Sequence, residues 1–165
     1  MVVDVCIAGG GLAGLTLARQ LRQAVPDLRV LVLEKRAHPA PEAAHKVGES
    51  SVEIAAHYFG TVLGLEPHLH ARQLPKMGLR YFFTAAGNER LEQRFELGPA
   101  GFPPVPSYQL DRGRLENFLL ESDRELGITV LDRAIVRDWT SGDPHRLEVD
   151  TPTGRLSVQA RWLVD

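Results

Sequence analysis

The residues best suited to chemistry are three glycines and one acid near the N-terminus. Gly9, Gly11 and Gly14 are spaced as Gly-x-Gly-x-x-Gly, and Glu34 follows Gly14 by 20 residues. Glycines at these positions permit a tight turn, a close approach of the backbone to a pyrophosphate, and close packing of a helix on a strand. Glu34 is suited to accept hydrogen bonds from a ribose, and its charge disfavours the additional phosphate of NADP. The pattern predicts dinucleotide binding, with a glycine-rich turn that holds no ligand as the alternative.

This chemistry needs a strand before the glycines and a helix after them. Residues 2–8 are rich in β-branched side chains and predict a strand. Apolar residues recur at helical spacing over 12–24, so the first N–H groups of a helix, at Leu12 and Ala13, face the phosphates. Residues 28–33 are nearly all apolar, as in a parallel strand buried on both faces. Together the three elements predict a Rossmann-type βαβ unit.

The remainder of the chain predicts further elements of both kinds. The Ser50-x-x-Glu53 pattern predicts a capping box that opens a helix ending near Leu63, and Asp111 is the expected N-cap of a helix that Gly127 ends. The neighbourhood of His68 and His70 is predicted as a loop. The expected strands are 78–84 and 91–97, joined as a hairpin, then 128–131, a three-stranded antiparallel meander at 134–139, 145–150 and 155–159, and a buried strand at 161–165.

Composition and charge exclude several classes of protein. The chain of 165 residues is 44% hydrophobic and 24% charged, with a net charge of -2 and no basic stripe, which argues against nucleic-acid binding. No apolar stretch reaches the roughly 18 residues of a membrane span, and we expect a cytoplasmic protein. The single cysteine, Cys6, excludes an intramolecular disulfide, and no carboxylate or cysteine lies at metal-ligand spacing from the histidines. Because a strand closes the sequence, we expect the chain to be the first third or so of a longer protein.

From Gly9 to Asp165 the order of features resembles FAD-dependent monooxygenases, and within them the tryptophan-halogenase-like branch. The glycine loop alone is shared with NAD-binding proteins, so the later segments favour FAD. The segments that carry the resemblance are the glycine loop, Glu34-Lys35-Arg36, Lys46-Val47-Gly48-Glu49-Ser50, Lys76 before a strand, the stretch from Tyr108 to Glu116, and Trp162-Leu163-Val164-Asp165.

The resemblance assigns roles to individual residues. It implies that the cofactor is held by Gly9, Gly11, Leu12, Ala13, Gly14, Glu34, Lys35, Arg36, Val47, Gly48, Ser50, Arg114 and Val136. Within this set Arg114 would reach the FAD phosphates, and the backbone of Val136 would meet the adenine. Glu49 and Lys76 would be catalytic, Lys76 standing between flavin and substrate and directing halogenation. The alternatives are a solvated charge for Glu49 and for Lys76, and a surface arginine for Arg114.

The resemblance also implies an architecture and an activity. The fold expected is α/β: a Rossmann-like FAD-binding domain over 1–72 and 108–165, with the beginning of an inserted β-rich substrate-binding domain over 73–107. The activity implied for the longer protein uses reduced flavin and O2 to halogenate or hydroxylate a small organic substrate, with a halide and a separate flavin reductase as further partners. The 165 residues alone are expected to be inactive. Two alternatives stay open: a reductase or dehydrogenase of the geranylgeranyl-reductase-like type, and a nucleotide-binding module without catalysis.

Overall fold

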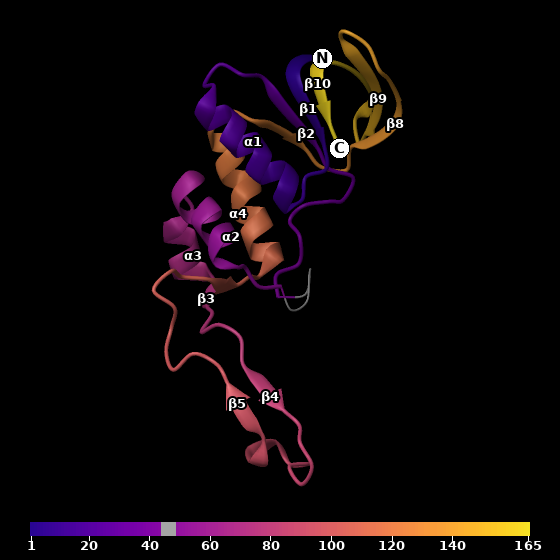
Figure 1. Ribbon diagram of the computed structural model, residues 1–165. Coiled ribbons are helices and arrows are strands. Elements are labelled where there is room, and N and C mark those ends of the chain that lie inside the picture. Colours follow the sequence, from indigo (N-terminus) through magenta and orange to yellow (C-terminus); the bar gives the residue numbers. More distant parts are fainter. Residues whose placement is uncertain (44–48) are drawn as a thin grey trace. The chain divides into compact units, whose positions relative to one another are not determined.

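The computed structural model describes residues 1–43 and 49–165, which fall into two units. The first unit combines Met1–Val47 with Asp111–Asp165, and the second is Gly48–Leu110. In Figure 1 the first unit contains the large sheet with helices α1 and α4, and the second contains the short helices and a hairpin. The chain therefore leaves the first unit, builds the second, and returns.

A six-stranded sheet of order β7-β2-β1-β10-β9-β8 forms the first unit. Its strands are β1 (Val2–Ala8), β2 (Val30–Leu33), β7 (Thr129–Leu131), β8 (Ile135–Thr140), β9 (His145–Thr151) and β10 (Gly154–Val164). The neighbours from β7 to β10 pair in parallel, whereas β10, β9 and β8 form an antiparallel meander. The predictions of a parallel sheet and of a three-stranded meander are both confirmed.

The last strand differs from its prediction. Residues 155–159 and 161–165 were expected as separate strands, but β10 runs without interruption from Gly154 to Val164. Its first part pairs antiparallel with β9, and its second part pairs in parallel with β1, which gives one strand two partners of opposite direction. Trp162 was expected to be buried, and this prediction is wrong, because 62% of the residue is exposed.

Two helices cover one face of this sheet and the meander curls over the other (Figure 1). Helices α1 (Leu12–Ala24) and α4 (Arg112–Glu125) lie side by side and bury Leu15 and Leu119 completely. On the opposite face Leu31 of β2 and Val149 of β9 belong to one apolar cluster, which also contains Cys6. Each large apolar side chain buried in this way stabilises the fold by roughly 1.5–3 kcal/mol.

A buried ion pair joins the two helices. The guanidinium of Arg19 on α1 donates to Asp123 on α4 over 3.2 Å, and Asp123 is fully buried. Burial raises the pKa of the Asp123 carboxyl to about 6, although the hydrogen bond and the charge of Arg19 act in the opposite direction. Its second oxygen, Oδ2, has no hydrogen-bond partner among the described residues. Asp123 is thus a charged group that folding must desolvate.

The ends of α4 follow the sequence prediction. Asp111 is the N-cap and accepts a hydrogen bond from the backbone N–H of Arg114 at 3.1 Å. Gly127 adopts a φ of 82°, the left-handed conformation that commonly ends a helix. The predicted limits of the first strand and the first helix, 2–8 and 12–24, are also those observed.

The second unit contains short elements only. They are α2 (Glu53–His57), the π-helical turn η1 (Tyr58–Val62), α3 (Glu66–Arg72), β3 (Leu74–Pro75), β4 (Tyr81–Phe83), the 3-10 turn η2 (Leu91–Gln93), β5 (Phe95–Leu97) and β6 (Tyr108–Gln109). Strand β3 pairs with β6, and β4 pairs with β5, each pair antiparallel. The predicted hairpin is confirmed, although only 95–97 of the expected second strand is extended.

Two further predictions in this unit are wrong. The capping box does not form: Ser50 makes a β-bridge with Gln109, and α2 begins after Val52 without a side-chain cap. Ser50 takes part in strand pairing with Gln109 and therefore does not cap the helix. The region of the two histidines is the helix α3 rather than a loop, and Pro67 in its first turn is a residue that this position tolerates.

Candidate functional site

The glycine loop connects β1 to α1, and its geometry disfavours a side chain at three positions, once through the backbone conformation and twice through lack of space. Gly9 has a φ of +135°, a backbone conformation that L side chains rarely adopt. A Cβ at Gly14 would lie 1.8 Å from the carbonyl oxygen of Gly9, and a Cβ at Gly10 would lie 2.6 Å from the Cβ of Glu34. The turn, the contact between helix and strand, and the approach of the acid therefore each require glycine.

The N-terminus of α1 is open toward this loop. Its N-cap is Gly11, which has no side chain of its own to accept an N–H of the first turn. The first N–H groups of a helix carry partial positive charge and are suited to bind an anion. One of them, the N–H of Leu12, donates to the carboxylate of Glu116 at 3.1 Å.

Glu34 lies directly after β2 and faces the loop. One carboxylate oxygen accepts the N–H of Gly10 at 2.8 Å, and the other accepts the N–H of Arg36 at 2.7 Å. The residue is only 9% exposed. Because each carboxylate oxygen can accept more than one hydrogen bond, Glu34 can hold the loop in shape and still accept from a hydroxyl.

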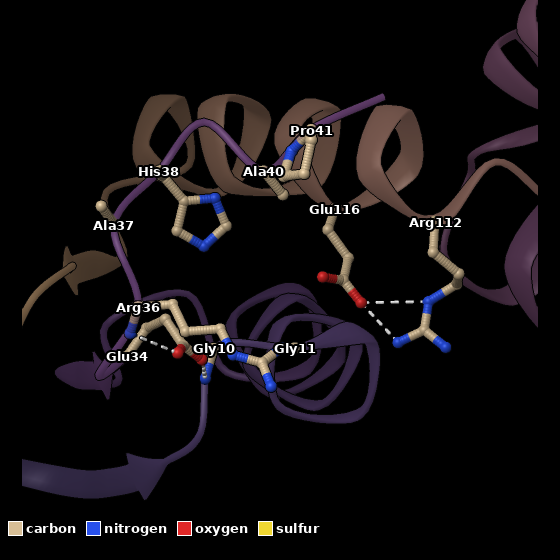
Figure 2. Close-up of a pocket in the computed structure, with 10 residues that line it drawn as sticks. All are labelled: Gly10, Gly11, Glu34, Arg36, Ala37, His38, Ala40, Pro41, Arg112 and Glu116. Atoms are coloured by element: carbon tan, nitrogen blue, oxygen red, sulfur yellow. Dashed lines mark hydrogen bonds and ion pairs between the residues drawn. The ribbon is translucent and has the colours of Figure 1, made fainter. Parts of the chain in front are cut away.

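A hollow of about 420 Å³ opens beside these groups (Figure 2). Its lining consists of Gly10, Gly11, Glu34, Arg36, Ala37, His38, Ala40, Pro41, Arg112 and Glu116. Figure 2 shows Arg36 on the segment after β2 and Arg112 on α4, with the glycine loop below. The hollow thus combines backbone N–H groups with two guanidinium groups and two carboxylates.

A smaller hollow of about 250 Å³ shares Glu34 with the first. It is lined by Ala8, Gly9, Leu33, Glu34, Lys35, Ala134, Ile135, Val136 and Asp165. Lys35 and Val136, which are 101 positions apart in the sequence, both line this hollow, because the N–H of Ala134 just before β8 donates to the carbonyl oxygen of Glu34 just after β2. Glu34 therefore lies between a hollow lined mostly by aliphatic side chains, with Lys35 and Asp165 beside them, and a more strongly charged hollow.

The arginine that lines the larger hollow is not the one selected from the sequence. Arg114 is partly exposed and donates through Nε to Glu42 at 3.1 Å. Arg112, two positions earlier in the same helix, is the residue of this pair that lines the hollow. Sequence reasoning missed Arg112 together with Gly10 and Glu116, although the spacing of Arg112 and Glu116, four residues apart in one helix, indicates a side-chain pair.

Lys76 occupies a buried position in the second unit. The residue is 9% exposed, and its Nζ donates to the carbonyl oxygen of Ser51 at 3.2 Å. Its backbone N–H donates to the carbonyl oxygen of Ser107 at 2.8 Å. A solvated lysine at a strand edge would have neither this burial nor this partner, so that alternative is wrong.

Lys76 lies close to the segment that contains Glu49 and Ser50. Ser51 exchanges two hydrogen bonds with Tyr108, each of 2.8 Å, and the carbonyl oxygen of Glu49 accepts the N–H of Leu110 at 2.8 Å. Strand pairing therefore brings together residues 49–51, Lys76 and the segment 107–110. The predicted site residues Val47 and Gly48, with Lys46, lie outside the described residues.

The fold and the loop together define a class of protein. A βαβ unit with this glycine turn, an open helix N-terminus and an acid after the second strand is a Rossmann-type dinucleotide-binding domain. Comparison with known proteins agrees, because residues 7–74 match the family of NAD(P)-binding Rossmann-like domains.

Among dinucleotide-binding proteins, the chain is similar to flavin-dependent enzymes. The chain is 32% identical over 124 residues to the flavin-dependent halogenase chlA of Dictyostelium discoideum, an alignment that covers 72% of this chain. Its structure is similar to that of the myxobacterial chondrochloren halogenase CndH, described as a new variant of FAD-dependent halogenases, with a TM-score of 0.77 and 27% identity over 99% of this chain. The fold is also that of p-nitrophenol 4-monooxygenase PnpA from Pseudomonas putida, with a TM-score of 0.74 and 21% identity over 98% of this chain.

Residues 7–74 thus form a Rossmann-like domain, and most of the chain is similar to FAD-dependent halogenases in sequence and in fold. The chain spans 21% of the length of the Dictyostelium halogenase, 37% of CndH and 40% of PnpA.

No helix in 1–43 or 49–165 is long and apolar enough to cross a membrane. In the same part of the chain, no group of three or more histidine, cysteine, aspartate or glutamate side chains could hold a metal ion.

Proposed function

We propose that the first unit binds the ADP portion of FAD. The observation that carries this proposal is the pair of adjoining hollows that meet at Glu34 beside the glycine loop. A dinucleotide needs an apolar place for adenine, an acceptor for the ribose hydroxyls and donors for the pyrophosphate, in that order. The small hollow, Glu34 and the larger hollow provide these three in the same order.

Individual residues would then hold individual parts of FAD. The adenine would lie in the small hollow against Val136 and Lys35, and the ribose would bind the carboxylate of Glu34. The pyrophosphate would bind at the N-terminus of α1, where Gly11 is the N-cap and Ala13 belongs to the first turn. Arg112 would be the guanidinium that balances the phosphate charge, because it lines that hollow while Arg114 is paired with Glu42.

In the second unit, Glu49 and Lys76 would be the catalytic residues and Ser50 would contribute to cofactor binding. Bound FAD, once reduced by a separate flavin reductase, would supply the activation of O2 that hydroxylates a small organic substrate or, with halide, halogenates it. Lys76 would contribute a cationic Nζ that the carbonyl of Ser51 holds in place. Its burial removes it from bulk water, which strengthens its electrostatic effect on a bound reactant.

Residues 73–107 would begin the substrate-binding domain. Strands β4 and β5 expose Tyr81, Phe83 and Phe95 by 53%, 50% and 68%, respectively. Large aromatic side chains gathered on a surface mark a binding region more often than a solvated one. An aromatic wall of this kind suits an organic substrate.

Titration with FAD tests the cofactor proposal. We expect the protein to bind FAD and to quench its fluorescence, and we expect Glu34→Ala to weaken binding at least about tenfold through loss of a charge-assisted hydrogen bond and of support for Gly10. Asp27→Ala, which removes an exposed acid between α1 and β2, is the matched control and should bind as the parent does. A colourless protein that does not bind added FAD would contradict the proposal.

Activity is tested on the longer protein that contains this chain, with a flavin reductase, NADH, O2 and a panel of phenols and indoles. Halide-dependent chlorinated or brominated products, lost in Lys76→Ala while FAD stays bound, are the expected result. Hydroxylated products without a halide requirement would restrict the activity to that of a monooxygenase. Oxygen-independent reduction of an alkene would favour a reductase and would contradict both forms of the proposal.

A further inference from the structure

We propose that Glu116 is a positioning residue for the pyrophosphate site, an inference that rests on the proposed binding of FAD. Its carboxylate accepts a hydrogen bond from one backbone N–H of α1 and also orients the Arg112 guanidinium toward the hollow. Glu116 thereby determines which donors are left for the phosphates.

The position of Glu116 is the first observation. The residue is 3% exposed, although it is an acid in the middle of a helix that borders an open hollow. Its Oε1 accepts the N–H of Leu12 at 3.1 Å, and a Cβ placed on Gly11 would lie 3.8 Å from the same oxygen. The carboxylate therefore lies at the N-terminus of α1, where an anion is stabilised by the helix dipole.

The second observation is the partner of Glu116 on its own helix. The same Oε1 accepts Nε of Arg112 at 3.0 Å and also a hydrogen bond from Nη2 of Arg112. The Arg112 side chain is 15% exposed, so little of it is free to move into solvent. Two donors of one guanidinium on one acceptor fix the plane of the group as well as its distance.

These contacts connect parts of the chain that are far apart in sequence. Leu12 and Glu116 are 104 positions apart, and their hydrogen bond ties the glycine loop to α4. Desolvating a carboxylate is costly unless hydrogen bonds and an opposite charge compensate, and here Leu12 and Arg112 supply both. Without Glu116, the Leu12 N–H would lose this acceptor, and Arg112 would lose the contact that keeps it at the hollow.

This arrangement sets a specific expectation for the cofactor. With the Leu12 N–H already engaged, the pyrophosphate would be bound by neighbouring N–H groups of the loop and by Arg112. The hollow contains two guanidiniums, of Arg36 and Arg112, and two carboxylates, of Glu34 and Glu116. Arg112 thus contributes through a fixed orientation rather than through an excess of positive charge.

A double-mutant cycle with FAD and with ADP as ligands tests the proposal. We expect Glu116→Ala and Arg112→Gln each to weaken binding of both ligands about tenfold, and the double variant to bind no more than about twofold weaker than Arg112→Gln alone, as for residues that act as one unit. Glu116→Gln keeps an acceptor oxygen and should lie between parent and Glu116→Ala. Glu121→Gln, an exposed acid on α4, is the control and should bind as the parent does.

A second readout needs no ligand. In 1H–15N spectra of the ligand-free protein, the Leu12 amide should shift in both Glu116→Gln and Arg112→Gln, and should keep its position in Glu121→Gln. Additive losses of affinity, or unchanged affinity in a Glu116→Gln protein that is merely less stable, would overturn the positioning role. If the parent protein does not bind FAD, the proposed function fails, whereas an unmoved Leu12 amide refutes the Glu116 arrangement by itself.

Discussion

Substitution of Gly14 by alanine separates two opposing effects in α1. Intrinsic helix propensity favours alanine over glycine by about 1 kcal/mol within a helix. In this structure, however, the new Cβ would lie 1.8 Å from the carbonyl oxygen of Gly9 and 3.2 Å from Cγ2 of Ile7. The first distance is more than about 1 Å too short for non-bonded atoms, and the atom it meets is backbone, which cannot rotate away.

We therefore expect Gly14→Ala to lower the free energy of unfolding by about 3 kcal/mol, at the upper end of the usual cost of overpacking. Relief of the clash must move α1 away from β1 or displace the turn at Gly9, and either movement disturbs the phosphate-binding N–H groups. Affinity for FAD in the fraction that remains folded should fall by at least about tenfold, since a misplaced loop loses more than one hydrogen bond.

Urea denaturation followed by far-ultraviolet circular dichroism measures the stability change. Gly60→Ala is the matched control, because a Cβ there would have its nearest neighbour at 3.7 Å, an ordinary contact. That variant should be as stable as the parent or slightly more stable. A Gly14→Ala protein as stable as the parent, or stabilised as helix propensity alone suggests, would refute the steric reasoning.

Three further predictions concern the first unit. Because burial raises the pKa of Asp123 from its ordinary 3.8 to about 6, the ionised carboxyl opposes folding, and parent stability relative to Asp123→Asn should fall by about 2 kcal/mol between pH 4 and pH 7. Parallel urea-denaturation profiles would contradict this. Asp111→Ala, which removes the acceptor for the Arg114 N–H, should cost about 1 kcal/mol in urea denaturation, whereas Asp111→Asn should cost less. Gly113→Ala places a Cβ 2.2 Å from the carbonyl oxygen of Pro41. It should lower the melting temperature by several degrees, which corresponds to a loss of roughly 1–3 kcal/mol in the free energy of unfolding of a domain of this size. An unchanged melting temperature would show that the loop moves away without cost.

Elements whose cause is local were predictable. The first strand, the first helix and the capped helix at Arg112–Glu125 were predicted within a residue or two, because hydrophobic periodicity, a capping aspartate and a terminal glycine all act over a few neighbouring residues. The errors occurred where a distant partner competed with a local pattern. Ser50 begins a segment with the sequence of a capping box, but in the structure it pairs with Gln109 instead. That partner is 59 positions away.

The same distinction between local causes and distant partners applies to the candidate site. Gly9, Gly11, Gly14 and Glu34 could be identified from spacing, because a turn, a helix and one strand determine where they lie. Arg112 and Glu116 could not, since their relevance comes from a hydrogen bond between α4 and the N-terminus of α1, across 104 residues. The choice between Arg112 and Arg114, two cations in one helical turn, likewise depends on which face of α4 meets the loop.

The local sequence was therefore enough to establish a Rossmann-type βαβ unit and the residues that a dinucleotide requires of it. The tertiary structure alone decided that Lys76 is buried against Ser51, that Val136 and Lys35 line the same hollow, and that Glu116 lies at the helix N-terminus. The physical reason is that periodicity and turn chemistry depend on neighbours along the chain. Burial and the pairing of charges depend on neighbours in space, which the folded chain brings together from segments up to a hundred residues apart.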